Sequence, residues 1–188
     1  MTQHRSVAKV VPATRTVEGG GFVVRRTFPT GRLDMVDPFL LLDHMGPQDY
    51  GPGEAVGAPD HPHRGFETVT YMLEGAFEHH DSSGGGGYLG PGDVQWMTAG
   101  RGIVHQEMPH GDPAGRMHGF QLWANLPAAQ KMTAPRYQEV ASKDVTEVTD
   151  DDGTKVRIIS GEFWGRRGPV EGIAADPQYV DIAIPAGV

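Results

Sequence analysis

Glycine and proline interrupt this chain so often that only short structural elements fit between the interruptions. The 188 residues include 27 glycines and 15 prolines, nearly double the combined share of an average protein. The chain is also 38% hydrophobic and only 21% charged, so it holds enough apolar material to offset the entropy lost on ordering. This excludes a disordered linker. The pattern predicts an all-β domain of many short strands, at a length that suits one sizeable core.

Runs of β-branched and aromatic residues fill the spaces between these interruptions. Residues 127–132, which begin with a proline, form the one expected helix, and the Asp-Asp-Asp-Gly run at 150–153 is expected at the tip of a hairpin. Short strands at this spacing favour a barrel or a double-sheet jelly roll. The expected strands cover residues 22–28, 39–42, 66–73, 77–80, 94–98, 103–108, 117–123, 136–140, 155–159 and 179–184.

Charge and cysteine content narrow the kinds of partner and site. The formal net charge of −8 argues against direct nucleic-acid binding over a broad surface. The absence of cysteine excludes disulfides, thiolate metal sites, iron–sulfur clusters and a cysteine nucleophile. The N-terminus has no apolar signal-like core, and no segment approaches the ~18 apolar residues of a membrane span. We therefore expect a soluble, cytoplasmic protein with no membrane partner.

Two polar pairs are the main candidates for chemistry, and both have i, i+2 spacing. His61 and His63 flank Pro62, and His105 precedes Glu107 by two residues. Alternate residues of a strand share a face, so two such strands in one barrel could bring three imidazoles and a carboxylate together. That donor set suits a divalent first-row metal with open positions. Because Pro62 lacks a backbone donor, its pair should lie at a strand start or a sheet edge.

Spacing alone leaves a solvent-exposed arrangement open for either pair, because nine histidines give several such pairs by chance. The other histidines have plainer expectations. His79 and His80 precede a glycine-rich turn and are expected to be exposed. His44 is expected to form a hydrogen bond at the barrel end, and His118 lies either near the metal or on the outer face. The glycine run at 84–87 is expected to be a flexible turn, because no lysine–serine or lysine–threonine pair follows it.

Longer motifs resemble the pirin family of the cupin superfamily. HPHRGFETVTY occupies 61–71 and PGDVQWMTAGRGI occupies 91–103, followed by the H-x-E pair. DPFLLLDH at 37–44, HGFQLWANLP at 118–127 and YQE at 137–139 extend the likeness over essentially the whole chain. The resemblance implies a cupin barrel, that is, a double-stranded β-helix or jelly roll. It also implies a metal, usually iron, and the positions that match the family's ligands are His61, His63, His105 and Glu107.

Two glutamates, Glu107 and Glu67, are candidates for the carboxylate ligand of the metal. The general cupin pattern places a metal-binding glutamate a few residues after His-x-His, and Glu67 fits this because it follows His63 by four. The pirin pattern assigns the role to Glu107. A bulge at Gly65 could redirect Glu67 away from the metal. We expect Glu107 to be the ligand.

The family resemblance implies two functions of different classes. The first is a quercetin 2,3-dioxygenase-type activity on a flavonol and O2, with Fe(II) as the metal, other divalent first-row metals as alternatives, and Glu107 as both ligand and catalytic base. The second is an iron-redox-dependent module that binds a protein partner and co-regulates transcription or metabolism without turnover. A structural cupin with no bound metal is a third interpretation.

The family resemblance also predicts the domain organisation. Residues 1–135 are expected to form the N-terminal cupin barrel that bears the metal. Residues 136–188 are expected to be connecting strands and the start of a truncated second barrel, because pirins normally carry two and residues 178–185 resemble the opening strand of the second. Without the rest of the second barrel, apolar surface of the first barrel would be exposed, so self-association is expected.

Overall fold

A computed structural model of the chain describes residues 6–51, 53–110 and 115–187, and it is almost entirely β-structure. The all-β architecture predicted from the sequence is confirmed. The strands are β1 (Thr14–Glu18), β2 (Phe22–Phe28), β3 (Phe39–Asp49), β4 (Ala58–His63), β5 (Phe66–Glu74), β6 (Ala76–Asp81), β7 (Gly86–Leu89), β8 (Val94–Thr98), β9 (Ile103–His110), β10 (Arg116–Asn125), β11 (Arg136–Val140), β12 (Thr146–Thr149), β13 (Lys155–Ser160), β14 (Glu162–Phe163), β15 (Arg166–Arg167) and β16 (Tyr179–Ala183).

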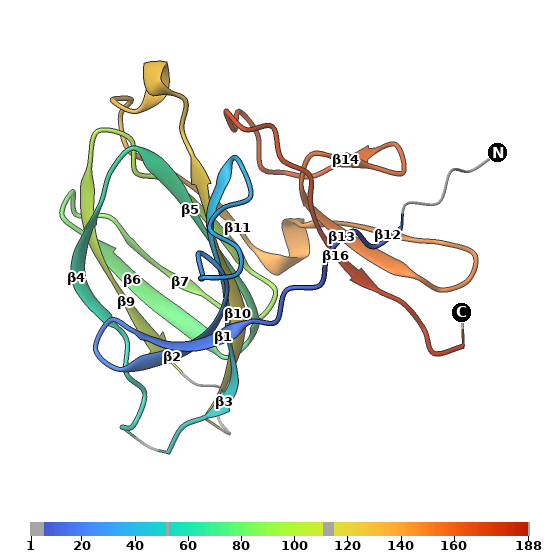
Figure 1. Cartoon of the computed structure of the whole chain (residues 1–188), viewed down its shortest axis with the longest axis horizontal. Coiled ribbons are helices and arrows are strands. Elements are labelled where there is room, and N and C mark those ends of the chain that lie inside the picture. The colour runs from blue at the N-terminus through green and yellow to red at the C-terminus, as the bar shows by residue number, and fades with distance from the viewer. Residues whose placement is uncertain (1–5, 52, 111–114, 188) are drawn as a thin grey trace.

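Two antiparallel sheets form the barrel seen in Figure 1. The larger sheet has seven strands in the order β1-β2-β3-β10-β5-β8-β11, and the smaller has four in the order β4-β9-β6-β7. The strand over 136–140 therefore pairs with β8 of the barrel. A separate three-stranded sheet, β12-β13-β16, and the hairpin β14-β15 follow it along the chain.

Two expected elements differ most in length from the structure, and the other differences are of one to three residues. The strand expected over 39–42 continues to Asp49, because β10 pairs with β3 as far as Asp49 across two register shifts. The helix expected over 127–132 is a 3₁₀-helix of three residues, Ala128–Gln130, held by i→i+3 bonds. So short a segment closes one tight turn and cannot develop an α-helix. The hairpin tip at 150–153 is confirmed between β12 and β13.

The central strands β5 and β8 of the seven-stranded sheet are buried on both faces, and the two faces have different roles. Along β5, Thr68 and Thr70 alternate with Val69 and Tyr71, and all four are buried. The face that carries Val69 and Tyr71 belongs to an apolar cluster shared with the C-terminal segment, residues 141–187. That cluster contains Trp96, Leu122, Val140, Val145, Ile159, Val170 and Ile173. The other face carries polar side chains toward the smaller sheet.

The C-terminal segment also exposes apolar side chains, at Trp164, Ile182 and Ile184. Self-association through this region stays a prediction.

Among the described residues, none of the helical segments has the length and apolarity that crossing a bilayer requires. The expected cytoplasmic location stays a prediction as well.

Because the apolar cluster contains side chains from both the barrel and the C-terminal segment, we expect the two to unfold together. Ile159→Ala should lower the free energy of unfolding by about 2–5 kcal/mol, the usual cost of a large truncation in a core. Urea unfolding followed by tryptophan fluorescence should show one transition at a lower midpoint. Ile184→Ala, at a side chain that is 65% exposed, is the control and should change stability by under about 0.5 kcal/mol. Two transitions, with the barrel's unchanged, would contradict this coupling.

Candidate metal centre

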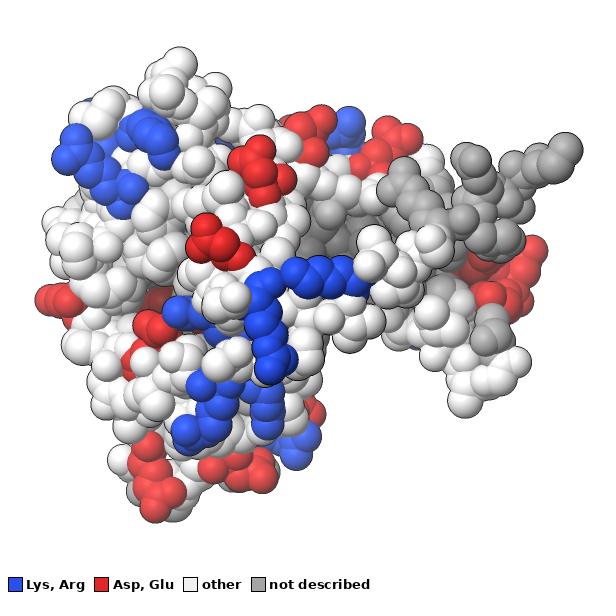
Figure 2. Space-filling view, in the orientation of Figure 1, with Lys and Arg blue, Asp and Glu red and all other residues white. Residues whose placement is uncertain are grey.

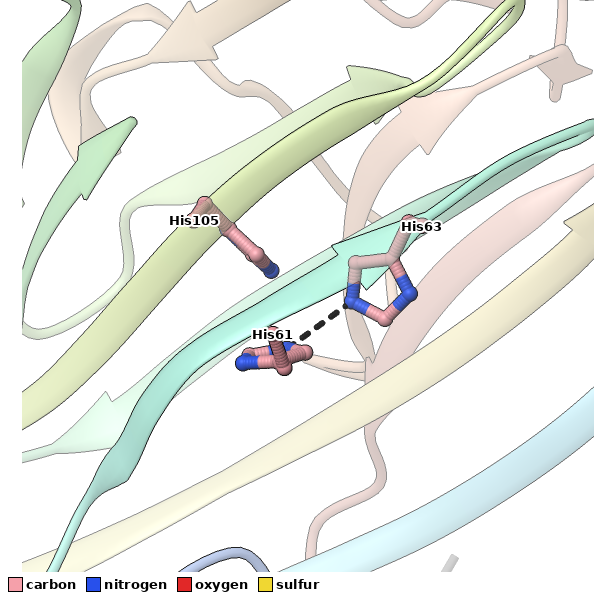
Figure 3. Close-up of side chains that lie close together, drawn as sticks. All are labelled: His61, His63 and His105. Atoms are coloured by element: carbon pink, nitrogen blue, oxygen red, sulfur yellow. Dashed lines mark hydrogen bonds between the residues drawn. The ribbon is translucent and has the colours of Figure 1, made fainter. Parts of the chain in front are cut away.

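Strands β4 and β9 bring the two predicted pairs together. Their register places His61 directly opposite His105, and β4 is the edge strand of its sheet, as expected from Pro62. The imidazole centroids of His61 and His105 are 4.5 Å apart, and those of His63 and His105 are 4.9 Å apart. Figure 3 shows the three rings converging between the two strands. Their ligand atoms all lie within 4.8 Å of one another.

The electrostatic environment favours the neutral forms of His63 and His105. Burial, followed by the nearby His105 and His61, lowers the pKa of His63 to about 3. Burial also lowers the pKa of His105, against the opposing effect of the neighbouring Glu107 carboxylate. A neutral imidazole presents a free lone pair, and this is the form that binds a metal.

The ring nitrogens of His105 support a metal site. Both are buried, and neither has a hydrogen-bond partner within the described part of the chain. A buried polar atom without a partner is costly. Ligation would satisfy one of the two nitrogens. The residues present therefore fit a divalent first-row metal, held by three imidazoles from two neighbouring strands.

Glu107 lies on the same face of β9 as His105, two residues further on, and is buried. Its Oε1 accepts a hydrogen bond from Thr70 Oγ1 at 3.2 Å, and Gln121 Nε2 donates to its two oxygens at 3.2 and 3.4 Å. Among the described residues, the group whose ligand atoms lie within 4.8 Å of one another consists of the three histidines and does not include Glu107. The carboxylate thus stands beside the imidazoles, held by two donors from the larger sheet.

Glu67 lies away from this group. The chain is not one regular strand from His63 to Glu67, because β4 ends at His63, Gly65 takes a φ of 80°, and β5 begins at Phe66. Its neighbour Phe66 lines the cavity beside the histidines, whereas Glu67 does not. Glu67 instead accepts a hydrogen bond from Thr98 Oγ1 at 2.7 Å. Glu107 therefore lies in the wall of the cavity beside the histidines and Glu67 does not, and Glu107 as the carboxylate ligand stays a prediction.

A cavity of about 720 Å³ opens beside the histidines, between the two sheets. His61, His63 and Glu107 lie in its wall. Most of the remaining wall is apolar or aromatic, and includes Phe22, Val24, Leu41, Met45, Phe66, Phe77 and Trp123. A second polar region of the wall is an ion pair in which Arg26 Nε and Nη2 donate to Asp43 at 2.8 and 2.6 Å.

A row of polar side chains crosses the inner face of the larger sheet at the level of Glu107. The strand registers pair these residues one after another, in the order Arg26, Asp43, Gln121, Thr70, Gln95 and Glu139. Thr70 and Gln121 bond to Glu107, and Gln95 Nε2 donates to Glu139 Oε1 at 3.2 Å. These supporting residues were not predicted, because they come from separate strands and carry no local motif.

The expectation that His79 is exposed is wrong. Its side chain is only 2% exposed, because β6 pairs with β9 and sets His79 opposite Glu107, toward the interior. Its Nε2 lies 2.8 Å from Glu139 Oε1. His80 is exposed, as expected. His118 lies on the outer face of the sheet and bonds to His44, so it is remote from the metal centre.

Two facing antiparallel sheets around a buried three-histidine group define a cupin-type barrel with a candidate metal centre. A comparison with protein-family models matches residues 21–124 to the family described as "Pirin". The chain belongs to the pirin family, as its motifs indicated.

Two relatives and one solved structure illustrate the similarity. A "Pirin-like protein" of Caulobacter vibrioides is 50% identical over 97% of this chain and 66% of its own length. A "Pirin-like protein" of Solanum lycopersicum is 46% identical over 99% of this chain and 61% of its own. A crystal structure of a quercetin 2,3-dioxygenase from Acinetobacter baumannii has a TM-score of 0.78 at 41% identity, covering 86% of this chain and 58% of that one. The chain thus spans about two thirds or less of the length of these proteins.

The two glutamates give different expectations for metal retention. Glu107→Gln should lower iron retention after dialysis by about tenfold or more, because it removes a charged oxygen donor beside the imidazoles. Glu67→Gln, the matched control, should retain iron as the parent chain does. Metal analysis of both variants after loading with Fe(II) checks this. Loss with Glu67→Gln and retention with Glu107→Gln would reverse the assignment.

Proposed function

We propose that this chain is a mononuclear iron dioxygenase that opens the ring of a flavonol such as quercetin. The ligands would be His61, His63, His105 and Glu107, with Fe(II) as the metal. The observation that carries this proposal is the three-histidine group beside a largely apolar cavity, with His61 and His63 in the cavity wall. A cavity of this size and lining suits a small aromatic ligand.

The chain's own residues would orient the substrate and move one proton. The 3-hydroxyl and 4-carbonyl edge of the flavonol would face the histidines, and the Glu107 carboxylate would accept the hydroxyl proton. Gln121 and Thr70 hold that carboxylate in place. Bound ferrous iron would supply Lewis acidity toward the hydroxyl and redox chemistry toward O2.

The aromatic side chains in the cavity wall favour a substrate with flat rings. The rings of Phe66 and Trp123 lie 4.6 Å apart at 32°, and His63 meets both of them edge-on at 5.2 Å. Aromatic walls of this kind bind planar rings by stacking and edge contacts. The similarity to the Acinetobacter quercetin 2,3-dioxygenase, at 41% identity, supports the same substrate class.

Turnover tests this function directly. Iron-loaded protein mixed anaerobically with quercetin should bind the flavonol, and addition of O2 should produce equal amounts of O2 uptake and carbon monoxide release. His80→Ala, at an exposed histidine outside the cavity, should behave as the parent chain does. Binding of quercetin without O2 uptake or carbon monoxide would reject the dioxygenase. Capture of a protein partner by only one iron oxidation state would then favour the redox-dependent module.

Gln121 offers a test of how the carboxylate is positioned. Gln121→Leu keeps the side chain's approximate size but removes the donor to both oxygens of Glu107. We expect kcat to fall by about 10–100-fold, as is usual for a lost outer-shell partner, with a smaller change in quercetin binding to the apoprotein, because Gln121 also lies in the cavity wall. Stopped-flow turnover and quenching of tryptophan fluorescence measure the two effects separately. Unchanged kcat would show that Gln121 does not position the base.

A further inference from the structure

A second polar cavity lies on the outer face of the larger sheet, opposite the metal centre. The registers place Arg15 opposite Arg25 on β1 and β2, and Arg25 opposite His44 on β3. Their sequence neighbours Arg26 and Asp43 line the inner cavity instead. Because successive side chains of a strand point to opposite faces of the sheet, the same strands contribute to one cavity on the inner face and to another on the outer face. The outer cavity has a volume of about 290 Å³, and Arg15, Arg25 and His44 contribute to its wall together with Gly46 and Gln48.

The cationic side chains of this cavity lack compensating carboxylates. Like charges directly opposite each other on neighbouring strands destabilise a sheet. Arg15 has no hydrogen bond or ion pair within the described part of the chain, whereas Arg25 donates through Nη1 to the carbonyl of Gly46. The nearby carboxylate of Glu74 is already engaged by Arg116 Nε at 2.5 Å. Figure 2 shows blue side chains gathered over β1 and β2, on a chain whose net charge is −8.

His44 is fixed in this cavity by two contacts. Its Nε2 lies 2.8 Å from Nε2 of His118, and its ring stacks on Phe120 at 4.8 Å and 16°. His118 Nδ1 lies 3.7 Å from Glu74. Burial, with His118 and Arg25 adding to it, lowers the pKa of His44. In the tautomer in which His118 donates, Nδ1 of His44 carries the ring proton and has no partner in the described residues.

We propose that this outer cavity is a binding site for a small oxyanion, namely inorganic phosphate or the phosphate end of a monoester. The guanidinium groups of Arg15 and Arg25 would donate to its oxygens, and Nδ1–H of His44 would complete the donor set. Arginine suits this role because its planar group matches phosphate geometry. The anion would also neutralise the repulsion between the two facing arginines. The site is independent of the proposed dioxygenase, because none of its polar side chains lies in the wall of the inner cavity, and Val24 alone contributes to both walls.

Phosphate titration at fixed ionic strength, with chloride as the balancing anion, tests the proposal. Calorimetry should give saturable binding with one site per chain, and the imidazole NMR signals of His44 and His118 should shift while that of His61 stays. Arg15→Gln and Arg25→Gln should each weaken binding by about tenfold or more, the effect of one lost charge-assisted hydrogen bond. Arg15→Gln removes no structural contact, so a folding defect is not expected.

Arg32→Gln is the matched control, because it removes the same charge from an exposed arginine outside the cavity. It should change phosphate affinity by under about twofold, the small effect of a distant screened charge. Phenyl phosphate used in a parallel titration identifies the source of the anion. Tighter binding of phenyl phosphate supports a monoester, and tighter binding of inorganic phosphate supports the free ion. Non-saturable binding, or equal losses in Arg32→Gln and Arg25→Gln, would overturn the proposal.

Discussion

The pairing of β4 with β9 is the constraint on which the rest of the site depends. His61 lies opposite His105. Because alternate residues of a strand share a face, His63 lies on the same face as His61, and Glu107 lies on the same face as His105. A slip of one residue would turn a whole ligand pair to the other face of its strand. The pairing also places β4 at the sheet edge, where Pro62 leaves no ladder bond unmade.

A barrel with a polar interior needs partners for its buried groups, and the larger sheet supplies them. Its inner row donates to Glu107 from Thr70 and Gln121, and Glu139 of the same row bonds to Nε2 of His79. Its outer face is apolar around Trp96 and packs on the C-terminal segment. One sheet therefore provides both the apolar burial that stabilises the chain and the fixed donors that orient the Glu107 carboxylate.

Much of this could be predicted from the sequence where the signal is local. The strands over 22–28, 94–98 and 136–140 have the predicted bounds, because turn residues or loops bound them. The histidine pairs were found through strand alternation. The burial of His79 was missed, because His-His-Asp before a glycine run is typical of an exposed turn and only the pairing with β9 buries it. Gln121 and Thr70 could not be predicted as partners of Glu107, because register alone brings these distant segments together.

The central claim is that three imidazoles and the Glu107 carboxylate hold one metal in the barrel. The most direct measurement is a crystal structure of the iron-loaded chain, with the metal located by anomalous scattering at the iron edge. The account predicts a single iron peak in bonding contact with His61, His63 and His105 and with a Glu107 oxygen. Iron at another position, or bonded to Glu67 in place of Glu107, would contradict it.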